Sequence, residues 1–74
     1  MKKNIPIVLS IAGSDSSGGA GIQADIKTLN TMNVFAATAV TCVTAQNTQE
    51  VSSITKIPPS LVEAQILSVK KDFK

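Results

Sequence analysis

Residues 7–30, IVLSIAGSDSSGGAGIQADIKTLN, combine a strand pattern, a glycine-rich turn and a helix pattern. This stretch opens with the nearly continuous apolar run Ile7–Ala12, which is typical of a short strand covered on both faces. The next nine residues, Gly13–Gly21, contain all four glycines of the chain and therefore predict a purpose-built turn. An amphipathic helix from about Ala20 to Met32 is predicted next, because apolar residues recur at helical spacing: Ile22, Ile26 and Leu29.

Two further strands are expected after this helix. The segment Val34–Ala45 carries no charge and is dominated by small and β-branched residues, which predicts a central strand from Ala37 to Thr44. Gln46–Gln49 is a polar turn at the carboxyl end of that strand, and Val51–Ile57 predicts a weaker third strand.

A second helix is expected after the break at Pro58-Pro59. The residues Ser60-Leu61-Val62-Glu63 fit a capping box, in which the serine oxygen accepts a hydrogen bond from an N3 amide and the glutamate reaches back. Apolar residues then form a stripe with the spacing i, i+4, i+7, i+11: Val62, Ile66, Val69 and Phe73. Lysines in the last turn complement the helix dipole.

This order of elements, strand-helix-strand-strand-helix, predicts an α/β layered fold that begins with a right-handed crossover. A parallel sheet needs helices on both faces, and two helices cannot cover it, so the sheet is expected to be incomplete. The apolar stripe is still running at Lys74, without a glycine that would end the helix. We therefore expect residues 1–74 to be a single N-terminal fragment of a larger domain, which aggregates or depends on a partner.

Composition argues against a nucleic-acid-binding or membrane-spanning protein. The net charge of +2 comes from seven lysines against five acidic residues, and the chain has no arginine, tyrosine or tryptophan to stack on bases. No stretch approaches the ~20 apolar residues of a membrane span, so a cytoplasmic protein is expected. We interpret the lysines near the two ends as solvated: Lys2, Lys3, Lys70, Lys71 and Lys74.

No metal site is predicted. Cys42 is the only cysteine and the chain has no histidine, so no metal-ligand spacing exists. A single thiol inside an apolar run is most often a buried small hydrophobic residue, and it fits a reducing compartment.

The glycine-rich turn does not match either of the well-known phosphate-binding loops. Gly13-x-x-x-x-Gly18 opens like a Walker A loop, but Gly19-Ala20 follows where that loop needs lysine and a hydroxyl residue. The G-x-G-x-x-A pattern of Gly19–Ala24 begins six residues beyond the first strand, and the second strand ends at Gln46 rather than at an acid. What remains is a loop that offers unpaired amides at a helix N-terminus, where anions and polar groups are stabilised.

Two polar side chains near the strand ends are candidate ligand-binding residues. Asp25, in the first turns of the helix, either complements the helix dipole or points at a ligand hydroxyl from the mouth of the sheet. Gln46 is either a solvated turn residue or a reader of a ring nitrogen beside an exocyclic amine, as glutamine reads adenine. The residues alone leave both pairs of interpretations open.

The motifs IAGSDSSGGAGIQAD, residues 11–25, and TAQNT, residues 44–48, closely resemble the start of the hydroxymethylpyrimidine/phosphomethylpyrimidine kinases. These ThiD-type enzymes of thiamine biosynthesis belong to the ribokinase-like superfamily, which has a three-layer α/β/α fold. The resemblance runs from about Ile7 to Lys74 and covers the N-terminal portion of the family, well under half of its length.

The resemblance implies an enzyme that uses MgATP to phosphorylate an aminopyrimidine alcohol, 4-amino-5-hydroxymethyl-2-methylpyrimidine, and then its monophosphate. By this resemblance Gln46 would hold the aminopyrimidine edge, Asp25 would hold the hydroxymethyl group, and Gly13 and Thr44 would line the ring pocket. The ATP site and the catalytic base of the family lie beyond Lys74. We therefore expect part of a substrate pocket here, with no catalytic residue, and a chain that binds no MgATP and is inactive alone.

Two other functions remain open on the sequence. The chain would be a non-catalytic pyrimidine-binding subunit or remnant if it docks on a partner that supplies the rest of the sheet. It would alternatively be part of a pyridoxine-type kinase, since some members of the family resemble both. Gln46 beside Ala45 favours the aminopyrimidine. Self-association, or association with the missing C-terminal half, is the expected partnership.

Overall fold

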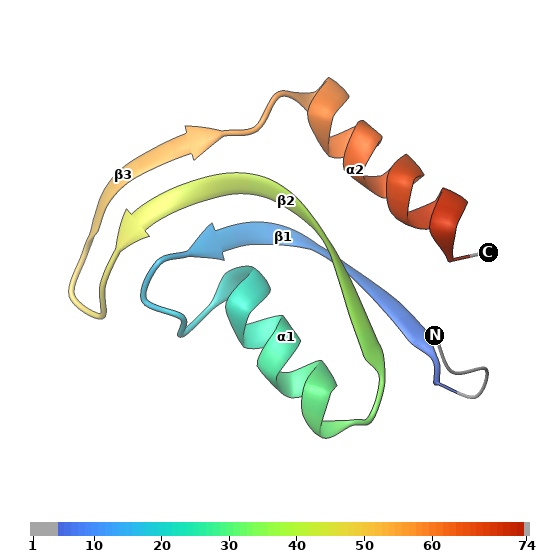
Figure 1. Ribbon diagram of the computed structural model, residues 1–74. Coiled ribbons are helices and arrows are strands. Elements are labelled where there is room, and N and C mark those ends of the chain that lie inside the picture. Colours follow the sequence, from blue (N-terminus) through green and yellow to red (C-terminus); the bar gives the residue numbers. More distant parts are fainter. Residues whose placement is uncertain (1–4, 74) are drawn as a thin grey trace.

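A computed structural model describes residues 5–73 and shows an open sheet with one helix on each side (Figure 1). The elements follow the predicted order, strand-helix-strand-strand-helix. Their bounds are β1 Ile7–Asp15, α1 Gly21–Thr31, β2 Phe35–Gln46, β3 Val51–Lys56 and α2 Pro59–Asp72. The lysines at positions 2, 3 and 74, interpreted above as solvated ends, lie outside the described residues.

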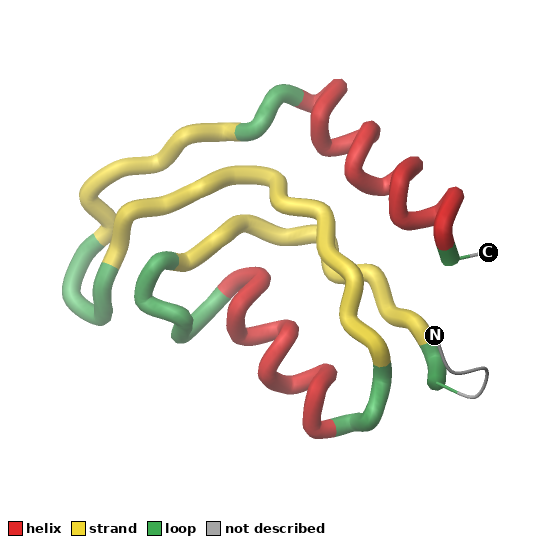
Figure 2. The backbone as a smooth tube through the Cα atoms, in the orientation of Figure 1, coloured by secondary structure: helices red, strands yellow, loops and turns green. Residues whose placement is uncertain are grey.

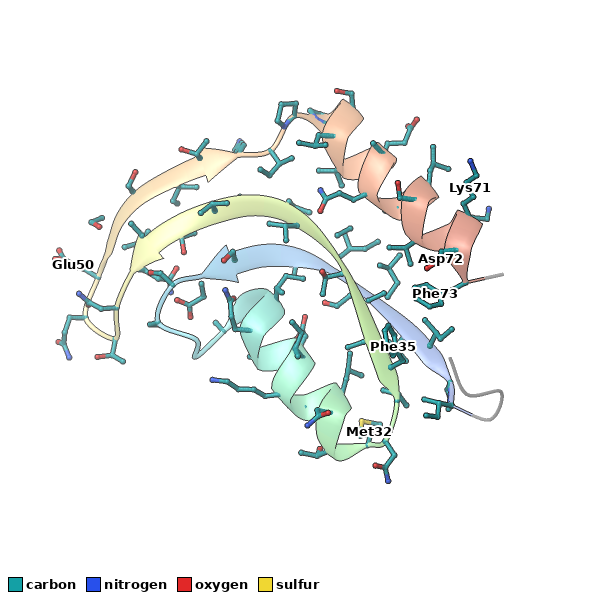
Figure 3. All side chains as sticks on the ribbon, viewed as in Figure 1. Met32, Phe35, Glu50, Lys71, Asp72 and Phe73 are labelled. Atoms are coloured by element: carbon teal, nitrogen blue, oxygen red, sulfur yellow. The ribbon has the colours of Figure 1, made fainter. Side chains whose placement is uncertain are left out.

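The sheet has the order β1-β2-β3 (Figure 2). β1 and β2 are parallel and are joined through α1, as the crossover prediction requires, whereas β3 returns antiparallel to β2. The register pairs Ile7 with Phe35 at the start of the parallel ladder. On the α2 side the rings of Phe35 and Phe73 contact each other, with centroids 5.3 Å apart, and Figure 3 shows them facing one another.

β1 and β2 are both longer than predicted. The apolar run predicts that β1 ends at Ala12, before the first glycine, but the strand continues to Asp15. Gly13 lies at a bulge between the pairs Ala12–Val40 and Ser14–Val43, where one residue of β1 stands opposite two residues of β2. A Cβ atom on Gly13 would lie 2.5 Å from the Sγ atom of Cys42, so glycine leaves room here for the Cys42 side chain against β1.

The predicted capping box before α2 is wrong. The N-cap residue is Pro58, no side chain caps the helix, and Pro59 takes the first helical position. Proline is favoured there, because its fixed φ angle already suits a helix and its missing N–H has no partner to lose. Ser60 is therefore inside the first turn and is no longer placed to act as the N-cap. The lysines of the last turn, Lys70 and Lys71, are where the dipole argument put them.

The hydrophobic core is small. Among the described residues three apolar side chains are buried: Ile22, Ala37 and Ala39. Every residue of β3 is exposed, α2 buries none of its residues fully, and Cys42, expected to be buried, is only partly covered. These features agree with the expected incomplete sheet. Neither helix is long and apolar enough to cross a membrane within the described part of the chain.

One side chain of α2 completes the open edge of β2. β3 pairs with β2 only from Cys42 onward, so the backbone of β2 before that point faces no strand on this side. Gln65 accepts a hydrogen bond from the amide of Val40 at 2.8 Å and donates one to its carbonyl oxygen at 2.9 Å. The glutamine amide thus replaces one residue of a neighbouring strand, which satisfies backbone groups that are costly to leave unpaired.

The conformation of Gly21 leads to a first prediction. Its φ angle is +61°, and a Cβ atom there would collide with the carbonyl oxygen of Gly13. Gly21→Ala should therefore lower the free energy of unfolding by more than the ~1–2 kcal/mol that a left-handed backbone costs an ordinary residue. Urea denaturation followed by circular dichroism measures this loss.

Gly19→Ala is the matched control, because a Cβ atom at Gly19 meets nothing closer than 3.9 Å. Equal losses of stability in the two variants would contradict the proposed close approach of Gly21 to β1.

Candidate functional site

The glycine-rich turn is organised by one buried carboxylate, Asp15, which is only 4% exposed. Its Oδ1 atom accepts hydrogen bonds from the amide and the hydroxyl of Ser17, at 2.8 and 2.7 Å. Its Oδ2 atom accepts one from the amide of Ala20 at 2.8 Å, and its carbonyl oxygen accepts one from the amide of Gly18 at 3.0 Å. The expectation of a loop with unpaired amides is therefore wrong for these three, because Asp15 already takes them.

These contacts also explain the electrostatics of the turn. The hydrogen bond from the Ser17 hydroxyl is the main cause that lowers the pKa of Asp15 below its ordinary value of 3.8. Burial acts in the opposite direction, and the backbone amides of Ser17 and Ala20 add to the lowering. Ala20 is the N-cap residue of α1, so Asp15 places a negative charge at the positive end of the helix.

Sequence reasoning missed Asp15. The available signal was the Asp-Ser-Ser-Gly pattern of Asp15–Gly18, since an aspartate often accepts the amide two residues ahead in a turn. The glycines around it favour a ligand-binding loop, a pattern that does not show that the ligand of the amides is Asp15 itself.

A serine of the turn binds the end of the neighbouring strand. The Oγ atom of Ser16 donates to the backbone carbonyl oxygen of Gln46 at 2.6 Å and accepts from the backbone N–H of Gln46 at 2.8 Å. On the other side, the Gln23 side chain accepts from the amide of Asp15 and donates to the Oγ atom of Ser14, both at 2.8 Å. The turn is thus tied to β2 and to α1, and the backbone of Gln46 is held in place.

Three of the four predicted binding residues lie together where β1 and β2 end. The hydroxyl oxygen of Thr44 is 2.8 Å from Gln46 Oε1 and 2.8 Å from the carbonyl oxygen of Ser14. Gly13 precedes Ser14 on β1, and Cys42 packs over it. Thr44 and Gln46 are both half-buried, so their polar groups remain within reach of a ligand. This is the carboxyl edge of parallel strands, where ligands of open α/β sheets bind.

Asp25 is held separately, on the α1 side of the sheet. Its Oδ2 atom accepts a hydrogen bond of 2.6 Å from the Ser10 hydroxyl, and the two residues line a small hollow with Val8, Thr28 and Leu29. No hydrogen bond within residues 5–73 joins Asp25 to Gln46, Thr44 or Gly13. Asp25 also lies beyond the first turn of α1, which contains no acidic residue, so the dipole interpretation is not supported.

The glycine-rich turn offers no free amide for a phosphate at Ser17 or Ala20. The amides of the turn that would receive a phosphate are bonded to a carboxylate that repels anions. Within residues 5–73 no group of three or more histidine, cysteine, aspartate or glutamate side chains could hold a metal ion. Gln46 and Thr44 offer an amide and a hydroxyl at the end of β2, and Asp25 offers a carboxylate on the α1 side of the sheet.

The lowered pKa of Asp15 predicts how stability depends on pH. A carboxylate whose pKa is lower in the folded state stabilises the fold above its unfolded pKa, near 3.8, and that contribution is lost as the pH falls through the folded value. The stability difference between the native chain and Asp15→Asn should be constant from pH 7 to about pH 4 and should shrink below it. Urea denaturation at a series of pH values measures the difference.

Asp72→Asn, at the exposed end of α2, is the control and should keep the native dependence on acid. A native chain and an Asp15→Asn variant that lose stability in parallel below pH 4 would show that Asp15 does not carry this effect.

Comparison with known proteins gives one consistent family. The family model described as phosphomethylpyrimidine kinase matches residues 15–74. The hydroxymethylpyrimidine/phosphomethylpyrimidine kinase of Haemophilus influenzae is 55% identical over 71 residues, which are 96% of this chain and 26% of that protein. The chain thus spans about a quarter or less of the length of the curated relatives that it matches.

Solved structures agree with the sequence comparison. The crystal structure of phosphomethylpyrimidine kinase from Clostridium difficile superposes with a TM-score of 0.87 and 44% identity, over 95% of this chain and 30% of that one. Bacillus subtilis pyridoxal kinase gives a TM-score of 0.82 and 38% identity, over 93% of this chain and 28% of that one. The expected fold, the N-terminal part of a ribokinase-like α/β domain, is confirmed. The chain belongs to the phosphomethylpyrimidine kinase family.

Proposed function

We propose that this chain forms the acceptor side of a hydroxymethylpyrimidine/phosphomethylpyrimidine kinase. It would hold the aminopyrimidine alcohol whose hydroxyl receives the phosphate of MgATP in the complete enzyme. The observation that carries the proposal is the arrangement of Gln46, whose backbone is tied to Ser16 and whose amide lies against Thr44. A glutamine held at both points is preorganised to read the edge of a ring.

Asp25 has the chemistry needed for the alcohol. Ser10 occupies one oxygen of the carboxylate, and Oδ1 keeps its capacity to accept a hydrogen bond from a ligand hydroxyl. Ser10 also limits the rotation of the carboxylate, so the acceptor is held in one direction. We assign Asp25 to the hydroxymethyl group on this basis.

Gly13 and Thr44 complete the proposed pocket wall. Cys42 Sγ fills the space where a side chain of Gly13 would stand, so any contact of Gly13 with the ligand is made by its backbone. Thr44 contributes a hydroxyl that is already engaged with Gln46 and Ser14.

A pyridoxal kinase activity is the second candidate, since pyridoxal kinases from two bacteria superpose on this chain. The higher identity to a phosphomethylpyrimidine kinase, 44% against 38% and 32%, favours the pyrimidine. The relatives named for thiamine biosynthesis favour it as well.

We propose that residues 1–74 form the N-terminal part of the kinase domain in the cytoplasm and act together with the remainder of that domain. An apolar groove of about 790 Å³ between α2 and the β2–β3 hairpin is lined by side chains that include Ile54, Ile66 and Leu67. Ile54 and Leu67 are 60% and 54% exposed, and exposed apolar patches of this kind mark surfaces that bind another part of a protein. The Haemophilus influenzae relative has about three times as much further sequence, enough to cover such a groove.

Calorimetric titration of the chain with 4-amino-5-hydroxymethyl-2-methylpyrimidine tests the binding function. The native chain should bind, and Gln46→Ala should weaken binding by about tenfold to a hundredfold, because a paired glutamine contact is worth ~1–3 kcal/mol. Gln49→Ala removes a similar side chain from the exposed turn and should bind like the native chain. Equal binding by the Gln46→Ala and Gln49→Ala variants would show that Gln46 does not bind the ligand.

A second experiment tests the kinase assignment. The chain is co-expressed with the part of the Haemophilus influenzae relative that lies beyond the matched region. The pair should phosphorylate the aminopyrimidine alcohol with MgATP, and Asp25→Asn should reduce kcat/KM by at least about tenfold, since one hydrogen bond to a charged acceptor is lost. Preferential phosphorylation of pyridoxal would establish the second candidate instead.

A further inference from the structure

The hydroxyl of Thr44 has two neighbours that compete for one proton. Its Oγ1 atom lies 2.8 Å from the carbonyl oxygen of Ser14 and 2.8 Å from Gln46 Oε1. Both neighbours are pure acceptors, and a threonine hydroxyl carries a single O–H donor with two acceptor lone pairs. One hydroxyl cannot make a full, linear hydrogen bond to both oxygens at once, so one of the two contacts is weakened by the facing lone pairs.

Turning the Gln46 amide by 180° about its last side-chain bond removes this conflict. The two ends of an amide have almost the same shape, so the heavy atoms stay in place and only the oxygen and nitrogen exchange positions. Gln46 Nε2 then donates to Thr44 Oγ1, and the Thr44 hydroxyl donates to the Ser14 carbonyl oxygen. Each of the three groups now has a compatible partner.

We infer that Thr44 sets the orientation of the Gln46 amide, so that Gln46 presents its carbonyl oxygen and one remaining N–H to a ligand. Thr44 is therefore a specificity-determining positioning residue for the site at the end of β2. The orientation of the amide is a property of the ligand-free chain, whereas its effect on ligand choice rests on the proposed function of Gln46.

This orientation selects the chemistry of the ligand edge. One acceptor and one donor on Gln46 match a ring that carries an exocyclic amine beside a ring nitrogen. With the amide in the opposite orientation, the Thr44 hydroxyl would engage one lone pair of the oxygen. Gln46 would then present its acceptor and its donor in exchanged positions, which match a ring N–H beside a carbonyl oxygen. Thr44 thus favours an aminopyrimidine over the corresponding oxo compound.

The backbone around Thr44 makes the orientation hard to escape. The Ser16 hydroxyl binds the backbone N–H and the backbone carbonyl oxygen of Gln46, at 2.8 and 2.6 Å. The backbone of Gln46 is therefore held close to Thr44. The bulge at Gly13 brings Ser14 opposite Val43, which places the Ser14 carbonyl oxygen within reach of the Thr44 hydroxyl. The relay runs from the β1 backbone through Thr44 to the Gln46 amide.

Nuclear magnetic resonance of the ligand-free chain tests the orientation directly. In the native chain one proton of the Gln46 side-chain amide should be shifted by its bond to Thr44, and it should exchange slowly with solvent. Thr44→Val, which keeps the shape but removes the hydroxyl, should bring the two amide protons together and speed their exchange. Thr44→Ser should preserve the native signals. An amide signal that Thr44→Val leaves unchanged overturns the inference.

Binding measurements test the consequence for specificity. The probes are 4-amino-5-hydroxymethyl-2-methylpyrimidine and the analogue with an oxo group in place of the amine. The native chain and Thr44→Ser should prefer the amine, and Thr44→Val should reduce the ratio of the two affinities by about tenfold, because one hydrogen bond stops discriminating. An unchanged ratio overturns the inference.

Thr55→Val is the matched control, since Thr55 lies on exposed β3, opposite Val43, and the same chemical change there should alter neither readout. Thr44→Ala removes the same hydroxyl and replaces Thr44→Val if valine does not fold. A native chain that binds neither pyrimidine overturns the proposed function, while the amide signal of the ligand-free chain still decides the orientation of Gln46.

Discussion

The site depends on the burial of the Asp15 carboxylate inside the glycine-rich turn. Its two oxygens bind Ser17 and the Ala20 amide, so the turn closes on itself rather than on an external anion. The closed turn starts α1 at Gly21 and carries Ser16 to the end of β2. The Asp15 carboxylate thus fixes the start of α1 and the end of β2, between which a ligand would lie.

The glycines of this turn serve distinct physical purposes. Gly21 adopts a left-handed conformation and passes close to the backbone of Gly13, which brings the helix onto the strand. Gly13 leaves room for the Cys42 thiol to pack against β1 at the bulge. The bulge sets the register that pairs Ser14 with Val43. The cluster that resembles a phosphate loop is therefore a packing device. In the proposed kinase it supports the molecule that receives the phosphate.

Periodicity predicted the order of elements well, because it reports which face of each segment is apolar. It failed where a tertiary contact decided the local structure. β1 runs past Gly13 because a neighbouring strand pairs with it, and α2 begins at Pro59 because proline suits the first helical position better than Ser60 suits the cap. The Thr44–Ser14 contact required the bulged register, which no spacing in the sequence reveals.

Asp15 satisfies the amides of the glycine-rich turn, and we propose that ligand recognition belongs to the end of β2. Titration of the isotope-labelled chain, first with inorganic phosphate and then with the aminopyrimidine alcohol, tests this proposal most directly. We expect phosphate to leave the amide signals of Ser17 and Ala20 unchanged and the alcohol to shift the signals of Gln46 and Thr44. Saturable shifts of the turn amides with phosphate, and none at Gln46 with the alcohol, would contradict it.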